Sequence, residues 1–233
     1  MLDQAFEALL TFDWGSDLNA VKPIDEAIVA TTGDAAARTE LESRLVEVLN
    51  RDVSRDAKDY VCRALAVIGT AISVPTLAAM LSDAELSHMA RYALQPNPAP
   101  DATTALRDAL PKTSGVIKVG VIGSLGAKHD AESIPMLAGL LNDADPRIAR
   151  AAAIALGEIR TPKSAAVLTS AKSDDVTVAL AITDGSLSCA ESMLAAGNKM
   201  GALKVYKTLM ANADSPKHIK LAVTRGMLAC AGK

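Results

Sequence analysis

Three histidines and three cysteines are the side chains of this 233-residue chain that most readily bind metals or act as nucleophiles. His88, His129 and His218 are 41 and 89 residues apart, and none belongs to an HxxxH or CxxC arrangement. A metal site on a helix needs ligands three or four residues apart, or ligands that loops bring together. We therefore predict solvated histidines at turns and helix ends, no metal site and no cofactor.

The cysteines indicate packing rather than chemistry. Cys62, Cys189 and Cys230 are widely spaced and odd in number. A disulfide framework favours an even number of cysteines in a short secreted chain. We expect these three side chains to be small apolar residues at helix interfaces.

A glycine run and several acidic pairs resemble functional motifs but have structural explanations. Residues 120–126 approach a GxGxxG phosphate-binding pattern, yet the spacing differs and no strand is predicted before them. No serine lies in a GxSxG sequence. Acidic residues such as Asp143, Asp145 and the pair Asp174-Asp175 lie where helices are predicted to begin, and there they cap free N–H groups. The sequence therefore predicts no catalytic residue, and a protein that is not an enzyme.

One set of basic residues indicates binding. Four leucines occupy equivalent positions in successive predicted helices: Leu65, Leu94, Leu125 and Leu156. At 100° per residue, four basic side chains are predicted to share the half-face opposite the core: Arg63, Arg91, Lys118 and Arg150. Such a stripe could bind an acidic peptide or a phosphate-bearing ligand. The alternative is that these are ordinary solvated charges, since Asp56 and Asp59 share the same half-face.

The elements that position these side chains are indicated by a leucine repeat. Leu77, Leu106, Leu137 and Leu168 follow one another at steps of 29, 31 and 31 residues, in parallel with the first leucine series. A period near thirty residues is typical of stacked helical pairs, each of which contacts mainly its neighbours. The repeat therefore predicts an extended helical array.

The clearest unit runs from about residue 131 to 160. Pro135 lies in the first turn of its first helix, Asp145-Pro146 begins the second, and Gly157 lies near its end. Three prolines within 96–100 predict a rigid elbow, and Asp184-Gly185 could break a long helix. The other predicted pairs are 36–49 with 56–68, 74–81 with 86–94, 101–110 with 114–125, 162–171 with 174–195, and 198–211 with 216–229.

The whole chain is predicted to be one all-α domain, a right-handed α-α superhelix (solenoid) of about six helical hairpins. Within residues 1–233 we expect N-terminal capping helices over 1–33, regular repeats over 34–171 and divergent helical pairs over 172–233. Three aromatic residues near the start, Phe6, Phe12 and Trp14, are predicted to plug the open end of the array.

Charge and hydropathy exclude several classes of partner. A net charge of −3, a pI near 5.6 and only 3% aromatic residues argue against attraction to nucleic acid or an anionic membrane. No run of eighteen apolar residues predicts a transmembrane helix, and the first residues lack the pattern of a signal peptide. If the chain is complete, we expect it in the cytoplasm.

The unit over residues 131–160 resembles the short, HEAT-like type of HEAT repeat. Matching features are Pro135 in the first helix, Asp143 in the turn, and Ile148, Arg150 and Leu156-Gly157 in the second helix. Pro75, Asp83 and Leu94 repeat part of this pattern, and the resemblance covers roughly residues 35–170. It implies an interaction scaffold that binds a protein or peptide, which could be acidic, along the concave face lined by the second helices.

Two alternatives remain open, because fold does not determine function. Related arrays resemble bilin lyases and a class of DNA glycosylases. A nucleic-acid-binding protein would need a positive groove with stacking aromatics, whereas only Tyr60, Tyr92 and Tyr206 lie in the helical body. An enzyme would need clustered His, Cys or Asp on adjacent second helices.

Overall fold

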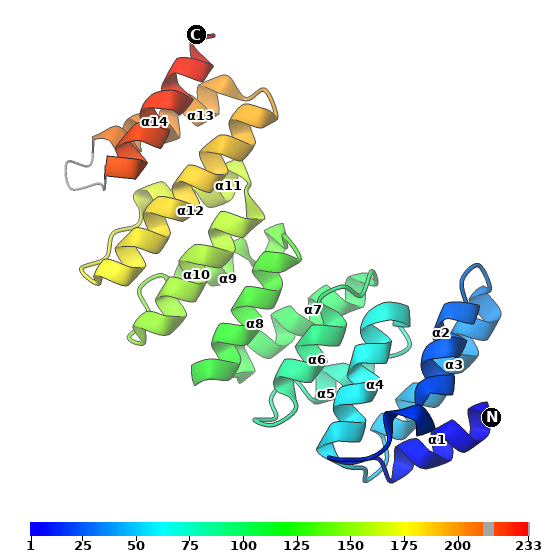
Figure 1. Cartoon of the computed structure of the whole chain (residues 1–233). Coiled ribbons are helices and arrows are strands. Elements are labelled where there is room, and N and C mark those ends of the chain that lie inside the picture. Colours follow the sequence, from blue (N-terminus) through cyan, green and yellow to red (C-terminus); the bar gives the residue numbers. More distant parts are fainter. Residues whose placement is uncertain (212–216, 233) are drawn as a thin grey trace. The chain divides into compact units, whose positions relative to one another are not determined.

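The structure, a computed structural model, describes residues 1–211 and 217–232 as an array of helices (Figure 1). These two ranges form fourteen α-helices and three short 3-10 helices, and they contain no strand. Within each of its two compact units, most consecutive helices pack against one another. The predicted all-α class and helical-repeat arrangement are therefore confirmed.

The helices follow the predicted pairing closely. Two N-terminal helices, α1 (Leu2–Leu10) and α2 (Lys22–Ala30), precede six pairs of a first and a second helix. The pairs are α3 (Ala35–Leu49) with α4 (Arg55–Ile68), α5 (Val74–Ala79) with α6 (Ser87–Leu94), α7 (Pro100–Ala109) with α8 (Gly115–Ala127), α9 (Ile134–Leu140) with α10 (Pro146–Ile159), α11 (Pro162–Ser170) with α12 (Val176–Ala195), and α13 (Lys199–Met210) with α14 (Lys217–Cys230). The 3-10 helices span Leu18–Ala20, Leu110–Lys112 and Ala131–Ser133. Pro216, where the last helix was expected to begin, lies outside the described residues.

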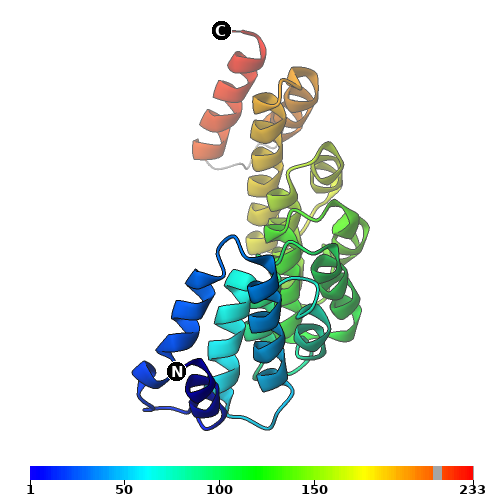
Figure 2. The same ribbon diagram turned by 90° about the vertical axis from the view of Figure 1, so that its right-hand side faces the viewer.

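The chain divides into two compact units, residues 1–121 and residues 122–233. In the first unit, α4 packs on α6 and α5 packs on α7, so second helices stack on second helices and first on first. The second unit repeats this order, with α10 against α12, α12 against α14, and α11 against α13. Figure 2 shows α14 beside α12 and α13 in this unit. The single domain with three subdivisions stays a prediction.

Polar side chains cap the N-termini of three second helices, close to the predicted boundaries. The Ser54 hydroxyl accepts a hydrogen bond from the Ala57 N–H at 3.0 Å at the start of α4. Asp145 and Asp175 accept from the first N–H groups of α10 and α12 in the same way. These N–H groups have no partner within their own helix, so each cap stabilises its helix by about 1 kcal/mol.

Both leucine series lie in the core, as the repeat predicts. All eight leucines are at most 1% exposed: Leu65, Leu77, Leu94, Leu106, Leu125, Leu137, Leu156 and Leu168. Alanines fill much of the remaining interface, including Ala152, Ala153 and Ala155 on α10. Small side chains let helix backbones approach closely, which explains how a chain with so few aromatic residues forms a core.

The possible break at Asp184-Gly185 is absent. Helix α12 continues unbroken over twenty residues. Gly185 instead lies against Gly157 of α10, since a Cβ atom placed on Gly157 would be 2.5 Å from the Gly185 Cα. Gly185 therefore allows the two helices to come into close contact, and α12 remains helical despite the low helix propensity of glycine.

The proline-rich segment forms an elbow fixed by a buried amide. Asn97 is 2% exposed, its Nδ2 donates to the Thr70 carbonyl at 2.9 Å, and its Oδ1 accepts from the Ala99 N–H at 2.9 Å. Pro100 then occupies the first turn of α7, where no N–H is needed.

The N-terminal aromatics act only in part as predicted. Phe6 is buried beneath the Arg44 guanidinium, whose Cζ lies 4.0 Å from the ring centroid, and Phe12 lies 6.0 Å from the Tyr60 ring. Trp14 is 93% exposed, so its predicted role in plugging the array is wrong. It occupies the turn after α1, whose backbone places the indole in solvent.

Candidate partner-binding groove

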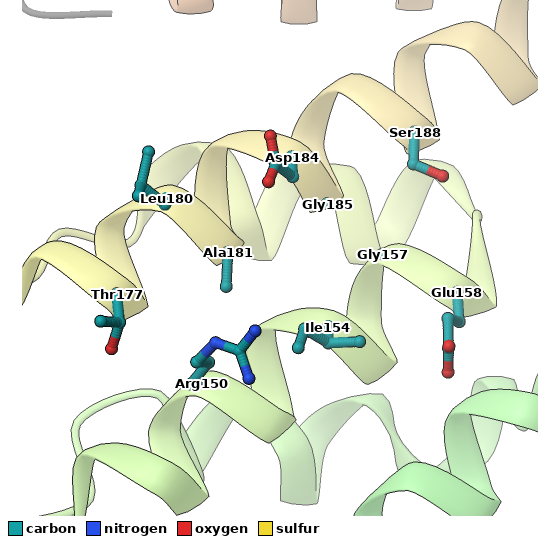
Figure 3. A pocket seen from close by; sticks show the side chains of 10 residues that line it. All are labelled: Arg150, Ile154, Gly157, Glu158, Thr177, Leu180, Ala181, Asp184, Gly185 and Ser188. Carbon is teal, nitrogen blue, oxygen red and sulfur yellow. The ribbon is translucent and has the colours of Figure 1, made fainter. Parts of the chain in front are cut away.

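An open groove of about 450 Å³ lies between α10 and α12, the second helices of two consecutive pairs in the unit 122–233. Figure 3 shows its lining, with one side from each helix. We call it the α10–α12 groove, and its residues are Arg150, Ile154, Gly157, Glu158, Thr177, Leu180, Ala181, Asp184, Gly185 and Ser188.

The floor of the groove consists of small residues. Gly157 and Gly185 bring the two helix backbones into contact, and Ala181 lies one turn before Gly185 on α12. Because no large side chain rises from these positions, the space above them stays open to solvent. The same glycines that pack the two helices therefore also hollow the surface between them.

Two apolar side chains line the middle of the groove. Ile154 of α10 is 37% exposed and Leu180 of α12 is 40% exposed. Isolated exposed apolar residues are common on protein surfaces, but an apolar lining in a hollow with a few polar groups is typical of binding sites.

Three charged side chains also line the groove: Arg150, Glu158 and Asp184. Arg150 is exposed in the N-terminal part of α10, and no hydrogen bond or ion pair to the described residues engages its guanidinium. In Figure 3 it reaches from α10 toward Ala181. Glu158 lies near the C-terminal end of α10 and leans toward Gly126, whereas Asp184 lies near the middle of α12. Along α10 the lining therefore runs from a positive residue through an apolar residue to a negative residue.

The two hydroxyls of the lining are already engaged. Thr177 donates its hydroxyl proton to Asp175 Oδ1 at 2.6 Å, and Ser188 Oγ accepts from Arg160 Nε at 3.2 Å. These contacts shape the rim and leave the groove with few free groups for pairing with a peptide backbone.

Three of the four predicted basic residues lie in the other unit. Arg63 is exposed, but it donates to Asp59 at 2.7 Å and its Cζ lies 5.8 Å from the Tyr92 ring centroid. The hydrogen bond that Arg63 donates to Asp59 raises the pKa of Arg63, and the carboxylate offsets its positive charge locally. Arg63 therefore belongs to a mixed-charge surface.

Arg91 is half-buried and has no ion pair with the described residues. Its guanidinium lies over Gly120, where any Cβ atom would collide with it, and its Nε is buried without a hydrogen-bond partner. Loss of hydration lowers the pKa of this arginine. Lys118 is also partly buried, on the side of α8 that continues toward the buried Val121 and Ile122.

The structure therefore distributes the four basic residues unevenly. Arg63 and Arg150 are fully on the surface, whereas Arg91 and Lys118 lie on the flanks of their helices. Sequence reasoning did not identify the groove residues Ile154, Leu180 and Asp184. Their signal was present, because residues 150, 154 and 158 on α10, and 180, 184 and 188 on α12, each recur every four positions along one helix face.

His129 and the cysteines occupy structural positions. His129 adopts a left-handed backbone conformation (φ 52°) after α8, and its Nδ1–H donates to the Glu158 carbonyl at 2.6 Å near the end of α10. Cys62 and Cys189 are fully buried, as expected, and Cys230 is half-buried. Over residues 1–211 and 217–232, no group of three or more His, Cys, Asp or Glu side chains is placed to hold a metal.

Comparison with known proteins supports the same class. Residues 103–184, which include α10 and the first nine residues of α12, match the family model for HEAT repeats. The chain is a helical-repeat protein, and the matched stretch overlaps the residues that resemble HEAT repeats in the sequence. A comparison with curated proteins found no match.

Two solved structures match the chain at low sequence identity. An engineered protein from the Northeast Structural Genomics Consortium has 18% identity and a TM-score of 0.46, over 90% of this chain and 97% of that one. Human deoxyhypusine hydroxylase, solved with glycerol, has 15% identity and a TM-score of 0.37, over 100% of this chain and 96% of that one. No described helix of the chain is long and apolar enough to cross a membrane.

Proposed function

We propose that the protein is a non-enzymatic interaction scaffold that binds a protein or peptide partner on the surface of its second helices. The observation that carries the proposal is the α10–α12 groove. There, exposed apolar residues lie beside an arginine that has no ion pair with the described residues, within the segment that matches HEAT repeats. Repeat arrays present such surfaces from rigid stacked helices, so little conformational entropy is lost when a partner binds.

Basic residues on the second helices contribute to this binding. Arg150 offers an exposed guanidinium at the groove, and Arg91 offers one that has lost hydration and whose Nε has no hydrogen-bond partner among the described residues. A carboxylate from a partner would supply charge-assisted hydrogen bonds to either group. Arg63 and Lys118 contribute less, because Arg63 is paired with Asp59 and Lys118 is partly covered.

A pair of photo-cross-linking variants tests the proposal. Ile154 on α10 and Met136 on α9 have nearly the same exposure, 37% and 36%, but lie on a second and a first helix. A photo-reactive amino acid at position 154 should cross-link a partner from native lysate, and Arg150→Ala should weaken that capture several-fold. Capture from position 136 with none from position 154 would contradict binding by the second helices.

The groove gives no support to the alternative of an enzyme or nucleic-acid-binding protein. Its lining includes neither a histidine nor a cysteine, and it has no aromatic side chain on which a base could stack. We therefore propose no second function.

A further inference from the structure

We infer that the occupant of the α10–α12 groove is an α-helix with a carboxylate, apolar residues and a basic residue along one face. The carboxylate lies against Arg150, the apolar residues lie against Ile154 and Leu180, and the basic residue lies near Asp184 and Glu158. This inference rests on the proposed function and names the kind of partner that the groove accepts.

The order of charges in the groove sets the first requirement. Arg150 and Glu158 are eight residues apart on the continuous helix α10, which separates them by about 12 Å along its axis. Asp184 lies one residue before Gly185, which contacts Gly157 of α10, so a second carboxylate stands on the C-terminal side of Arg150. A partner with opposite charges about 12 Å apart complements both ends, whereas two like charges would be repelled at one end.

The apolar middle sets the second requirement. Ile154 lies one turn after Arg150 and one turn before Glu158, and Leu180 of α12 belongs to the same lining. The groove volume of about 450 Å³ falls within the range of about 300–1,000 Å³ typical of ligand pockets. Apolar side chains three or four residues inside each partner charge would cover this middle and exclude water from it.

Backbone hydrogen bonding favours a helix over an extended peptide. An extended segment brings unpaired N–H and C=O groups to the surface that it binds, and these need polar partners. The lining has no Asn or Gln, the Thr177 hydroxyl donates to Asp175, and the Ser188 hydroxyl accepts from Arg160. A helix satisfies its own backbone and needs only side-chain contacts, which the groove provides.

The test is a selection from displayed helical peptides with the full chain as bait. The library is an alanine-based helix of about 16 residues in which five positions of one face vary, at i, i+3, i+4, i+7 and i+8. We expect enriched helices to combine Asp or Glu at one end with Lys or Arg seven or eight residues away, and Leu, Ile or Met between them. Both orders of charge satisfy the inference, because the helix can lie in either direction.

Charge reversal in the protein gives the decisive comparison. Arg150→Glu should lower the affinity for the selected helices at least tenfold. When this variant is used as bait, the selection should enrich helices with basic residues at both ends. The matched control is Lys204→Glu, which makes the same charge change at an exposed position on α13 and should leave affinity unchanged. Circular dichroism should show that both variants fold, since both side chains are exposed.

Two other results would overturn the inference. If the enriched helices were apolar and lacked the pair of opposite charges, the inferred order of charges in the partner would be refuted. The proposal that the groove binds a partner would still stand. If the unchanged protein enriched no more helices than the Ile154→Glu, Leu180→Glu double variant, helix recognition by the groove would be refuted. Cross-linking from position 154 would then test the proposed function independently.

Discussion

At the scale of single residues, the most constrained polar group is the carboxylate of Glu42 on α3. It is fully buried, and it accepts hydrogen bonds from the N–H groups of Thr70 and Ser73 and from the Thr70 hydroxyl, at 2.7–3.1 Å. One side chain of the first helix thus fixes the turn that leads into the next repeat. A buried carboxylate is stable only because these donors replace its hydration.

Glu42→Ala should lower the free energy of unfolding by about 2–3 kcal/mol, because it leaves buried N–H donors without an acceptor. Glu40→Ala is the matched control, since Glu40 is exposed on the same helix. Urea denaturation followed by circular dichroism measures both. Equal midpoints for the two variants would show that the turn does not depend on Glu42.

The thiols provide a second prediction at this scale. Burial, with a smaller contribution from Asp59, raises the pKa of Cys62 from 9.0 to about 12, and burial also raises the pKa of Cys189. Only Cys230 should react rapidly with a thiol reagent at pH 8 in the folded protein, because the thiolate is the reactive form. Mass spectrometry after brief labelling identifies the modified residues.

The raised pKa of Cys62 also predicts a loss of stability in alkali. The unfolded chain loses the thiol proton near pH 9 and the folded chain only near pH 12, so the contribution of Cys62 is intact below pH 9 and falls between these values. Cys62→Ala should therefore show a shallower fall in unfolding free energy over this range. A slope identical to that of the unchanged protein would contradict the assignment.

At the scale of helices, the contact between α10 and α12 depends on glycine. A Cβ atom on Gly157 would lie 2.5 Å from the Gly185 Cα, a backbone atom that cannot turn aside. Gly157→Ala should destabilise the protein by about 1–3 kcal/mol through overpacking, despite the helix propensity that alanine adds. Gly139→Ala on α9 meets nothing within 4 Å and should stabilise instead, by up to about 1 kcal/mol. Thermal unfolding of the two variants gives opposite shifts if the contact is as tight as described.

The helices were predictable from the sequence because leucine spacing reports burial directly. Leu125 and Leu156 mark the core of their helices, and caps such as Asp145 mark where helices begin. The residues of neighbouring helices that a given side chain contacts were not predictable in this way. Arg91 is half-buried because it happens to meet Gly120 of the next second helix, and the groove exists because Gly157 meets Gly185. Contacts of this kind depend on the offset between neighbouring helices, which a repeat period alone does not specify.

At the scale of the whole molecule, the two compact units predict that destabilisation stays local. Leu156 of α10 and Leu65 of α4 are equivalent buried leucines, one in each unit. Leu156→Ala and Leu65→Ala should each cost about 2–5 kcal/mol, since each leaves a cavity in a packed core. In a repeat array most stabilising contacts join neighbours, so each loss should raise exchange mainly in nearby helices.

Hydrogen exchange measured by mass spectrometry separates the possible outcomes. Leu156→Ala should raise amide exchange in α9–α12 and leave α3–α6 unchanged, whereas Leu65→Ala should do the reverse. Each variant is therefore the control for the other, because the side-chain change and its burial are the same. Equal loss of protection throughout the chain in both variants would mean that the protein opens as one cooperative unit. The groove residues Ile154 and Leu180 would then depend on the stability of the N-terminal repeats as much as on their own.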